Sequence, residues 1–421
     1  MQRTMWIGLV VVLAALATAP AVAGAASAGY DAHTLIVRYA ENTSSSQRSA
    51  AGRLAGVLER LGTVRGVGAD VVRVSGDPAA VAARLNRSAA VSYAEPNYIA
   101  RAGAIPNDPR FGELYGLHNT GQSGGGDDAD IDAPEGWDAA GLGAFPSALS
   151  AVKIGIVDTG ILAAHEDLAG KVVDCAGVRS FGIDLLGLIT LPLLADSTIV
   201  GGRCADDNGH GTHVAGTAAA RANNGRGVAG VAFNSPLAIC KALDRTGAGP
   251  VSGIANCIGY LAGTGARVIS MSLGTTADSV TLRNAVAAAS GTALIVAAAG
   301  NSGASTMEYP AGYPDVVSVA ATNRRDGHAG FSTANAKVEL AAPGEDVLST
   351  WNNGAYLTAS GTSMATPHVA GVAAIIAGRD LAGGPAAWRA RLRSAVDDLG
   401  PLGRDPQFGF GRVNLARAVT G

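Results

Sequence analysis

The chain has 421 residues, of which 58 are glycine and 5% are aromatic, so its core must be built from small aliphatic side chains joined by many tight turns. That length leaves room for two or three compact units. The formal net charge of −3, with no block of Lys or Arg, gives no basic field to hold a polyanion and argues against a nucleic-acid partner.

The first residues have the pattern of a secretory signal peptide, which we place at residues 1–28. Arg3 precedes an apolar run, and small residues offer cleavage points after Ala23 or Ala28. A membrane anchor would need about 20 apolar residues, and Pro20 interrupts the run before that length. We therefore expect a secreted, extracellular protein without a stable membrane anchor.

The next stretch, residues 29–101, predicts a small α+β unit of the ferredoxin-like kind. Strand patterns alternate with amphipathic helical patterns, and Asp77 caps the second helix. The predicted elements are strands at 33–40, 68–76 and 91–100 and helices at 46–62 and 77–87. The segment RAGAIPNDP that follows has two prolines and no periodicity, which indicates a linker or processing site.

From about Ile131 onward, apolar strand-like runs alternate with Ala-rich helical runs. This alternation predicts an α/β fold, with a mostly parallel twisted sheet covered by helices on both faces. Ligands of such sheets bind at the carboxyl ends of the strands, where Asp158 and Asn301 are expected. The apolar run at 183–200 is an insertion that we interpret as a packed surface loop.

Four cysteines suit disulfide bonds in an exported protein. Three pairings are possible, and closeness in sequence favours Cys175 with Cys204 and Cys240 with Cys257. No CxxC pair occurs, so a zinc site is not expected.

Asp158 lies in VDTGI, which is typical of aspartic proteases and of one class of serine protease. An aspartic protease needs a second carboxylate, but DTG occurs once and the α/β alternation does not suit an all-β enzyme. Two other motifs favour serine chemistry. DDNGHGTHVAG places His210 in a Gly-rich turn, and SGTSMATPHVAG places Ser363 at a helix start. A serine hydroxyl needs such a base and an orienting carboxylate.

VDTGI, NGHGTHVAG and GTSMATPHVAG together resemble the three active-site motifs of the subtilisin family of serine proteases, in the order Asp, His, Ser known for subtilisin. The resemblance covers about residues 107–421, and the preceding unit resembles the family's inhibitor-type propeptide at VSYAEPNYIA. It implies a propeptide at 29–101, which acts as an intramolecular inhibitor, and a catalytic domain at 102–421. The mature enzyme would be a self-processed, monomeric endopeptidase that acts on proteins or peptides without an organic cofactor.

The same resemblance implies the rest of the site. Asn301 would hold the oxyanion together with the N–H of Ser363, and Ser272, Leu273 and Gly274 would pair with an extended substrate. The S1 pocket would be lined by Gly274, Ala298, Ala299 and Gly300.

Glu308 would lie near the floor of that pocket, where many family members have Gly, Ser or Asn. A carboxylate there would favour Arg or Lys at P1, and Arg101, just before Ala102, would be a natural self-cleavage site. In the alternative interpretation Glu308 faces solvent and the pocket takes large apolar or aromatic residues. A catalytically silent peptide-binding homologue is the alternative of a different class.

The resemblance to thermitase-like members also implies a structural Ca²⁺ site, because its expected ligands are all oxygen atoms. They are the side chains of Asp108, Asp167 and Asn224 and the backbone carbonyls of Arg221, Arg226 and Val228. Three further histidines, His165, His213 and His368, are expected to be structural.

Overall fold

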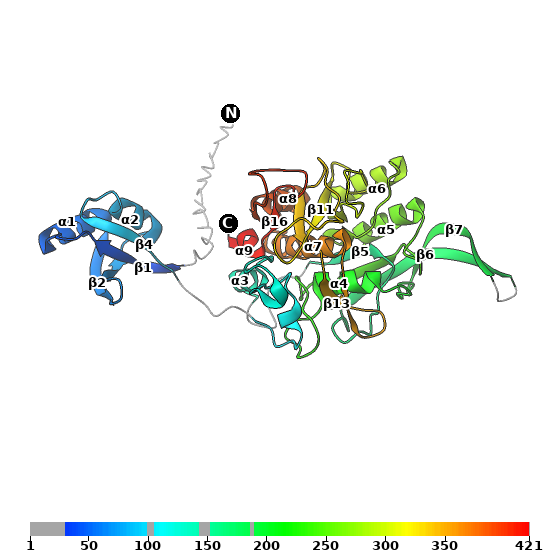
Figure 1. The fold of residues 1–421 in the computed structure, drawn as a ribbon, viewed down its shortest axis with the longest axis horizontal. Helices are drawn as coiled ribbons and strands as arrows, with labels where there is room; N and C mark the ends of the chain where they lie inside the picture. The colour runs from blue at the N-terminus through cyan, green and yellow to red at the C-terminus, as the bar shows by residue number, and fades with distance from the viewer. Residues whose placement is uncertain (1–29, 99–104, 143–151, 186–188, 421) are drawn as a thin grey trace, which may run out of the picture. The chain divides into compact units, whose positions relative to one another are not determined.

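A computed structural model describes residues 30–98, 105–142, 152–185 and 189–420. The chain divides into two compact units, Met1–Arg101 and Ala102–Gly421 (Figure 1). The expected signal peptide and the expected cleavage site at Arg101 lie outside the described residues.

The first unit is a four-stranded antiparallel sheet with two helices. Its core lies between the sheet and the helices, and contains Leu35, Val37, Val72 and Val81. The strand order is β2 (Val57–Val64), β3 (Ala69–Val74), β1 (Tyr30–Tyr39) and β4 (Val91–Tyr98), and the helices are α1 (Ser45–Ala55) and α2 (Pro78–Leu85). Asp77 caps α2 by accepting from the N–H groups of Ala79 and Ala80, as predicted.

The prediction of one helix over 46–62 was wrong in its second half. Helix α1 starts with a capping box between Ser44 and Gln47 and ends at Gly56, which has a left-handed φ of 97°. The residues after Gly56 form the edge strand β2, which pairs with β3. The amphipathic pattern continues past Gly56 in the sequence, but the left-handed conformation of this glycine ends the helix there.

The second unit is built on a ten-stranded sheet in the order β15-β16-β12-β11-β10-β9-β5-β8-β6-β7. The pairs from β16 to β6 are parallel, and only the two outermost pairs are antiparallel. The strands are β5 (Ile154–Asp158), β6 (Val172–Leu185), β7 (Ile189–Gly201), β8 (Leu237–Lys241), β9 (Val268–Met271), β10 (Leu294–Ala298), β11 (Val316–Thr322), β12 (Leu340–Pro343), β15 (Val396–Asp397) and β16 (Arg412–Val413). A separate hairpin pairs β13 (Val347–Thr350) with β14 (Tyr356–Ala359).

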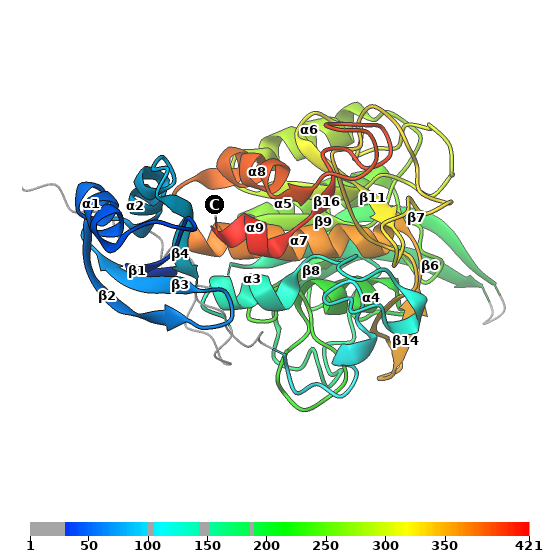
Figure 2. The same ribbon diagram turned by 60° about the vertical axis from the view of Figure 1, so that its left-hand side comes forward.

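Helices cover both faces of this sheet, which confirms the predicted α/β architecture. Along β5, Ile154 and Ile156 join the core on the side of α4 (His210–Ala219) and α7 (Thr362–Arg379), whereas Val157 joins the core under α5 (Val251–Gly263) and α6 (Val280–Ser290). Figure 2 shows α7 running through the middle of this unit beside α9 (Leu415–Thr420). The remaining helices are α3 (Ala133–Ala139), α8 (Gly384–Ser394) and the 3₁₀ turns η1 (Phe111–Glu113) and η2 (Gln122–Gly124).

The interpretation of 183–200 as a loop was wrong. Strands β6 and β7 form a long antiparallel hairpin at the edge of the sheet, and Figure 1 shows it extending away from the helices. The start of β6, from Val172 to Gly177, pairs with β8 and so joins the hairpin to the rest of the sheet. A disulfide between Cys175 and Cys204 joins the base of the hairpin, with a Cα–Cα distance of 5.4 Å.

The second disulfide joins Cys240 at the end of β8 to Cys257 in α5, with a Cα–Cα distance of 5.5 Å. Both bonds have the pairing that sequence proximity favoured.

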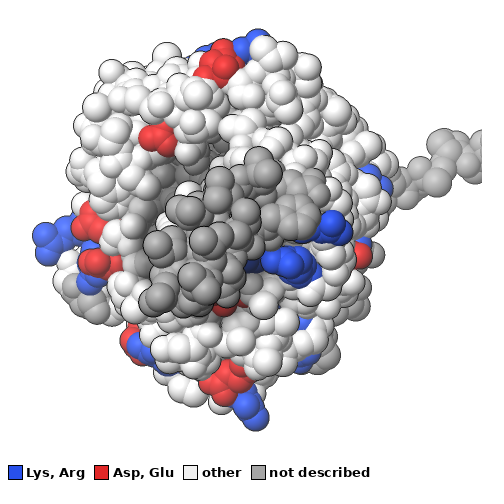
Figure 3. Space-filling model, turned by 90° about the vertical axis from the view of Figure 1, so that its right-hand side faces the viewer, with Lys and Arg blue, Asp and Glu red and all other residues white. Residues whose placement is uncertain are grey.

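Charged side chains are sparse, at 15% of the residues. On the face drawn in Figure 3, Lys and Arg are interspersed with Asp and Glu, and neither sign forms a continuous field. Among the described residues, no helix is both long and apolar enough to cross a membrane.

Candidate active site

Asp158 and His210 are in direct contact. Asp158 is the last residue of β5 and is fully buried, and His210 is the first residue of α4. Nδ1 of His210 lies 2.8 Å from Oδ1 of Asp158, and the N–H of Thr159 donates to the same oxygen at 2.7 Å. Because an ionised carboxylate only accepts hydrogen bonds, Nδ1 carries the proton and Nε2 is left as the basic nitrogen.

The electrostatic environment favours the protonated imidazole. Burial opposes the charged form, but the charge and hydrogen bond of Asp158, with a smaller contribution from the charge of Asp206, raise the pKa of His210 above its ordinary value. The ring is therefore a stronger base than a free histidine.

Ser363 is the second residue of α7, where the helix dipole favours negative charge. Its hydroxyl donates to the carbonyl oxygen of Ser272 at 3.2 Å, and the hydroxyl of Ser272 donates to the carbonyl of Ser363 at 2.8 Å. These reciprocal bonds hold the start of α7 against the segment that follows β9.

Asn301 follows β10 and is oriented by Thr362. The backbone N–H and the hydroxyl of Thr362 both donate to Oδ1 of Asn301, at 2.8 and 3.0 Å. A backbone N–H can only donate, so the amide oxygen must face Thr362 and the NH₂ group is available to another acceptor. The hydroxyl of Thr362 also accepts from the N–H of Gly300 at 3.2 Å.

The sequence motifs did not predict this role of Thr362. Its position next to Ser363 at a helix start was the available signal, but its partner lies 61 residues away.

A cavity of about 550 Å³ opens beside His210. Its lining includes Ser272, Leu273 and Gly274, together with Leu243 and Tyr309. The three residues expected to pair with an extended substrate thus line the same cavity as the histidine.

Glu308 lies between two glycines of the expected S1 pocket. A β-carbon added to Gly274 would collide with one carboxylate oxygen of Glu308, and a β-carbon added to Gly300 would collide with the other. Ala298 and Ala299 of the adjoining segment are buried. Burial raises the pKa of Glu308 above its ordinary value, because a partly desolvated carboxylate resists ionisation. The carboxylate is thus set among the residues expected to line the pocket.

The expected calcium ligands also come together. Asp108 accepts from the N–H groups of Asn223 and Asn224 at 2.6 and 3.0 Å. Asp167 accepts from the Asn224 side-chain amide and from the N–H of Val228, both at 2.9 Å. Both carboxylates are buried. Burial raises the pKa of Asp108 despite these hydrogen bonds, and the charge of Asp167 adds to the increase.

The backbone of Arg221 joins this cluster, since its N–H donates to the carbonyl of Asp167 at 2.9 Å. The side chain of Arg226 instead reaches Glu166, so only its backbone is available to the cluster. Neither Asp108 nor Asp167 forms an ion pair with Lys or Arg among the described residues. Two buried carboxylates without a basic partner, beside amide and carbonyl oxygens, fit a hard cation such as Ca²⁺. Asn224 would have to turn its amide to present the oxygen.

Within the part of the chain that the structure describes, no group of three or more His, Cys, Asp or Glu side chains could hold a metal ion. A cation at the Asp108 cluster would therefore depend on amide and carbonyl ligands as well as carboxylates.

The three histidines that were expected to be structural contact backbone carbonyls. Nε2 of His213 lies 3.0 Å from the carbonyl of Val347, Nδ1 of His368 lies 2.9 Å from that of Met364, and Nε2 of His165 lies 3.0 Å from that of Ala355. Burial lowers the pKa of both His213 and His368 to about 4, so these two rings are neutral.

The parallel sheet, the Asp–His pair and the serine at a helix start together define a serine hydrolase of the subtilisin type. The chain belongs to the subtilase family, whose model matches residues 150–411, and the model of the fervidolysin N-terminal prodomain matches residues 17–97. The family predicted from the motifs is thus confirmed. The protein is a subtilisin-like serine endopeptidase with an N-terminal prodomain.

Relatives and a solved structure agree with this assignment. The chain is 40% identical over 317 residues to thermitase from Thermoactinomyces vulgaris, and this match covers 75% of this chain and 99% of thermitase. It is 38% identical over 351 residues to a thermophilic serine proteinase from Bacillus sp. (strain AK1), and this match covers 82% of this chain and 77% of that protein. The solved S41 psychrophilic protease superposes with a TM-score of 0.55 at 33% identity, and the match covers 66% of this chain and 97% of that one.

Proposed function

We propose that Asp158, His210 and Ser363 form the catalytic triad of this endopeptidase. The observation that carries the proposal is the 2.8 Å contact between His210 and the buried Asp158, which fixes the imidazole tautomer that a serine nucleophile requires.

In this mechanism the Ser363 hydroxyl leaves the carbonyl of Ser272 and donates its proton to Nε2 of His210 as Oγ attacks the substrate carbonyl. The imidazolium then gives that proton to the leaving amine, and the acyl-enzyme forms. A water molecule loses a proton to His210 as it attacks the ester carbonyl. The bond to Oγ of Ser363 then breaks, His210 returns the proton to Oγ, and the acid is released.

Asn301 and the N–H of Ser363 would stabilise the oxyanion. The amide oxygen of Asn301 is occupied by Thr362, which supports a role for its NH₂ group as a donor. Loss of one such donor costs about 10²–10³ in kcat, a value known from subtilisin itself.

The substrate would bind as an extended strand along Ser272, Leu273 and Gly274. We further propose that the pocket accepts Arg or Lys at P1, because the carboxylate of Glu308 lies between Gly274 and Gly300. The opposite charge would offset the cost of desolvating a basic side chain.

The precursor would be exported by the signal peptide and cut near Arg101. The prodomain would inhibit the enzyme until that cut, and the mature domain would act as a monomer. Calcium would be held by Asp108, Asp167, Asn224 and the carbonyls of Arg221, Arg226 and Val228, and would stabilise the fold without taking part in the reaction.

A serine-directed phosphonate tests this function. The wild type should be labelled once, at Ser363, with loss of activity, and Ser363→Ala should not be labelled. A protein that binds peptides but resists the phosphonate would instead be the silent homologue.

A further inference from the structure

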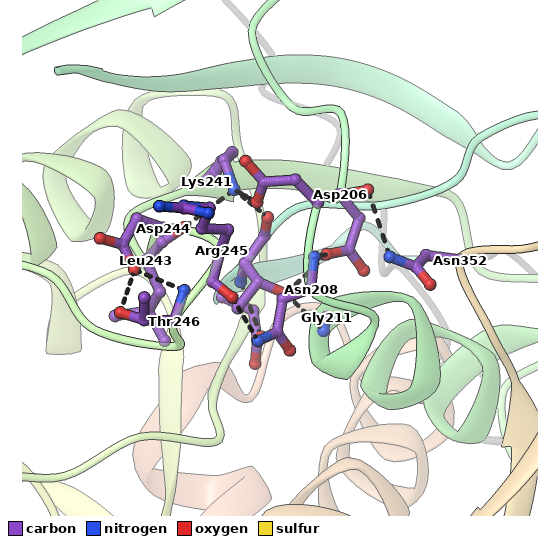
Figure 4. A network of polar contacts seen from close by, with 12 residues as sticks. Asp206, Asn208, Gly211, Lys241, Leu243, Asp244, Arg245, Thr246 and Asn352 are labelled. Carbon is purple, nitrogen blue, oxygen red and sulfur yellow. Dashed lines mark hydrogen bonds and ion pairs between the residues drawn. The ribbon is translucent and has the colours of Figure 1, made fainter. Parts of the chain in front are cut away.

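Asp206 lies beside Asn208 just before the start of α4 (Figure 4). Its carboxylate accepts five hydrogen bonds. Oδ1 accepts from the hydroxyl of Thr159 at 2.9 Å and from the N–H groups of Asn208 and Gly209 at 3.0 and 2.9 Å. Oδ2 accepts from the N–H and the hydroxyl of Thr212, at 3.0 and 2.6 Å. One side chain therefore binds the first turn of the His210 helix and the residue after Asp158.

The hydrogen bonds of Asp206 are linked through Thr159 to both Asp158 and the His210 helix. The N–H of Thr159 donates to Oδ1 of Asp158 at 2.7 Å, and its hydroxyl also accepts from the N–H of Gly211 at 2.9 Å. Nζ of Lys241 donates to the carbonyl of Thr159 at 2.5 Å. Movement of Asp206 would therefore shift the loop that presents the carboxylate relative to the helix that presents the imidazole.

The site requires a carboxylate. Every partner of Asp206 donates to it, and an ionised carboxylate has two oxygens that only accept. An amide of the same shape would turn one NH₂ group toward a donor. Burial opposes ionisation of Asp206, but the hydrogen bonds from Thr212, Gly209 and Asn208 lower its pKa below the ordinary value, so the group is charged at neutral pH.

We propose that Asp206 is a positioning residue for His210, which fixes the start of α4 against the residue that follows Asp158. The proposal rests on the triad proposed above and extends it to a residue that makes no contact with the reacting atoms.

The charges around His210 predict that loss of Asp206 changes the pH dependence of activity. Among the described residues, the titratable groups whose charges act on His210 are Asp158 from β5 and Asp206 from the preceding loop, and His213 of the same helix is coupled to it. His213 is neutral, so the two carboxylates supply the field that favours the imidazolium. Removing the charge of Asp206 lowers the pKa of His210, and the base then remains active at a lower pH.

The test compares Asp206→Asn with Asp207→Asn in the full-length protein after maturation. Asp207 is the matched control because it loses the same charge one residue away, while its exposed carboxylate pairs, among the described residues, with Lys241 alone and with none of the five donors that bind Asp206. Phosphonate titration counts the active sites, and kcat and KM are measured across pH on a substrate with Phe at P1. We expect kcat of Asp206→Asn to fall by about tenfold to a hundredfold with little change in KM, and its acid limb to move to lower pH. Asp207→Asn should keep both parental values.

Parental kcat and an unmoved acid limb in Asp206→Asn would overturn the proposal. The proposal would also be overturned if the activity of Asp206→Asn fell only in proportion to the number of titrated active sites. That result would mean that part of the protein is unfolded and that each folded molecule has parental activity. If Asp206→Asn yields no folded enzyme, Thr159→Val tests the hydrogen bond between the Thr159 hydroxyl and Asp206 while the charge of Asp206 is kept. It should lower kcat per titrated site without moving the acid limb, and an unchanged kcat would contradict the positioning role. Failure of the triad proposal is separate, since it would appear as an unlabelled parent enzyme.

Discussion

His210 and Asp158 meet through a single carboxylate oxygen. Nδ1 of His210 lies 2.8 Å from Oδ1 of Asp158, whereas Oδ2 is buried and has no hydrogen-bond partner among the described residues. The tautomer of the imidazole therefore depends on one contact at the end of β5.

Replacement of this carboxylate by an amide should disable the base. In Asp158→Asn, the side chain can present an N–H to Nδ1, which then becomes the acceptor and moves the proton to Nε2. We expect kcat to fall by about 10⁴ with the fold retained, measured by steady-state kinetics beside the melting temperature. A variant that keeps more than a tenth of the parental kcat would contradict this role of Asp158.

The acid limb of activity should lie above the pKa of an ordinary histidine. The reaction needs neutral His210, and its raised pKa means that the ring stays protonated to a higher pH. The limb of kcat/KM should therefore be centred above about 6.5. The profile is measured on a substrate with Phe at P1, so that Glu308 does not contribute. A limb centred below 6 would show that the field around His210 is not the one described.

Glu308→Gln should remove a preference for basic residues at P1. We expect kcat/KM for an Arg substrate to fall by about tenfold, the effect of losing roughly 1.4 kcal/mol of charge interaction, while a matched Phe substrate changes little. Because burial raises the pKa of Glu308, the Arg-to-Phe ratio of the parent should also fall as the pH drops and the carboxylate is protonated. If the parent clearly prefers the Phe substrate, or if the Arg-to-Phe ratio is the same in Glu308→Gln, the charge of Glu308 does not determine the P1 preference.

Removal of calcium should destabilise the mature enzyme. At a free Ca²⁺ concentration of a hundred times Kd, binding stabilises the native state by about 3 kcal/mol, so a chelator should lower the melting temperature. Asp167→Asn should lower it in the presence of Ca²⁺ and make it much less sensitive to the chelator, whereas the exposed Asp315→Asn should behave like the parent. An unchanged melting temperature in chelator would exclude a stabilising ion at this cluster.

Some parts of the fold were readable from the sequence because local and global signals agree there. Strand β5 is buried along its whole length, and the uncharged run IGIV at 154–157 is typical of a central parallel strand. The Asp77 cap and the Pro78 that follows it marked the start of α2 in the same way.

Other parts depend on partners that are distant in sequence. An apolar run such as 183–200 can pack as a loop or pair as strands, and here it lies in a hairpin whose two strands, β6 and β7, pair with each other. The roles of Thr362 and Asp206 depend on contacts 61 and 47 residues away. The residues of the proposed calcium site come from three separate segments, and only the family resemblance connected them.

The most direct test of the triad is self-processing. Intact mass and N-terminal sequence are measured for purified wild type beside Ser363→Ala, both expressed as the full precursor. We predict that only the wild type cuts itself between about Ala100 and Asn107, with Arg101 as the preferred site. If Ser363→Ala is processed in the same way and retains peptide hydrolysis, Ser363 is not the nucleophile and the proposed mechanism is wrong.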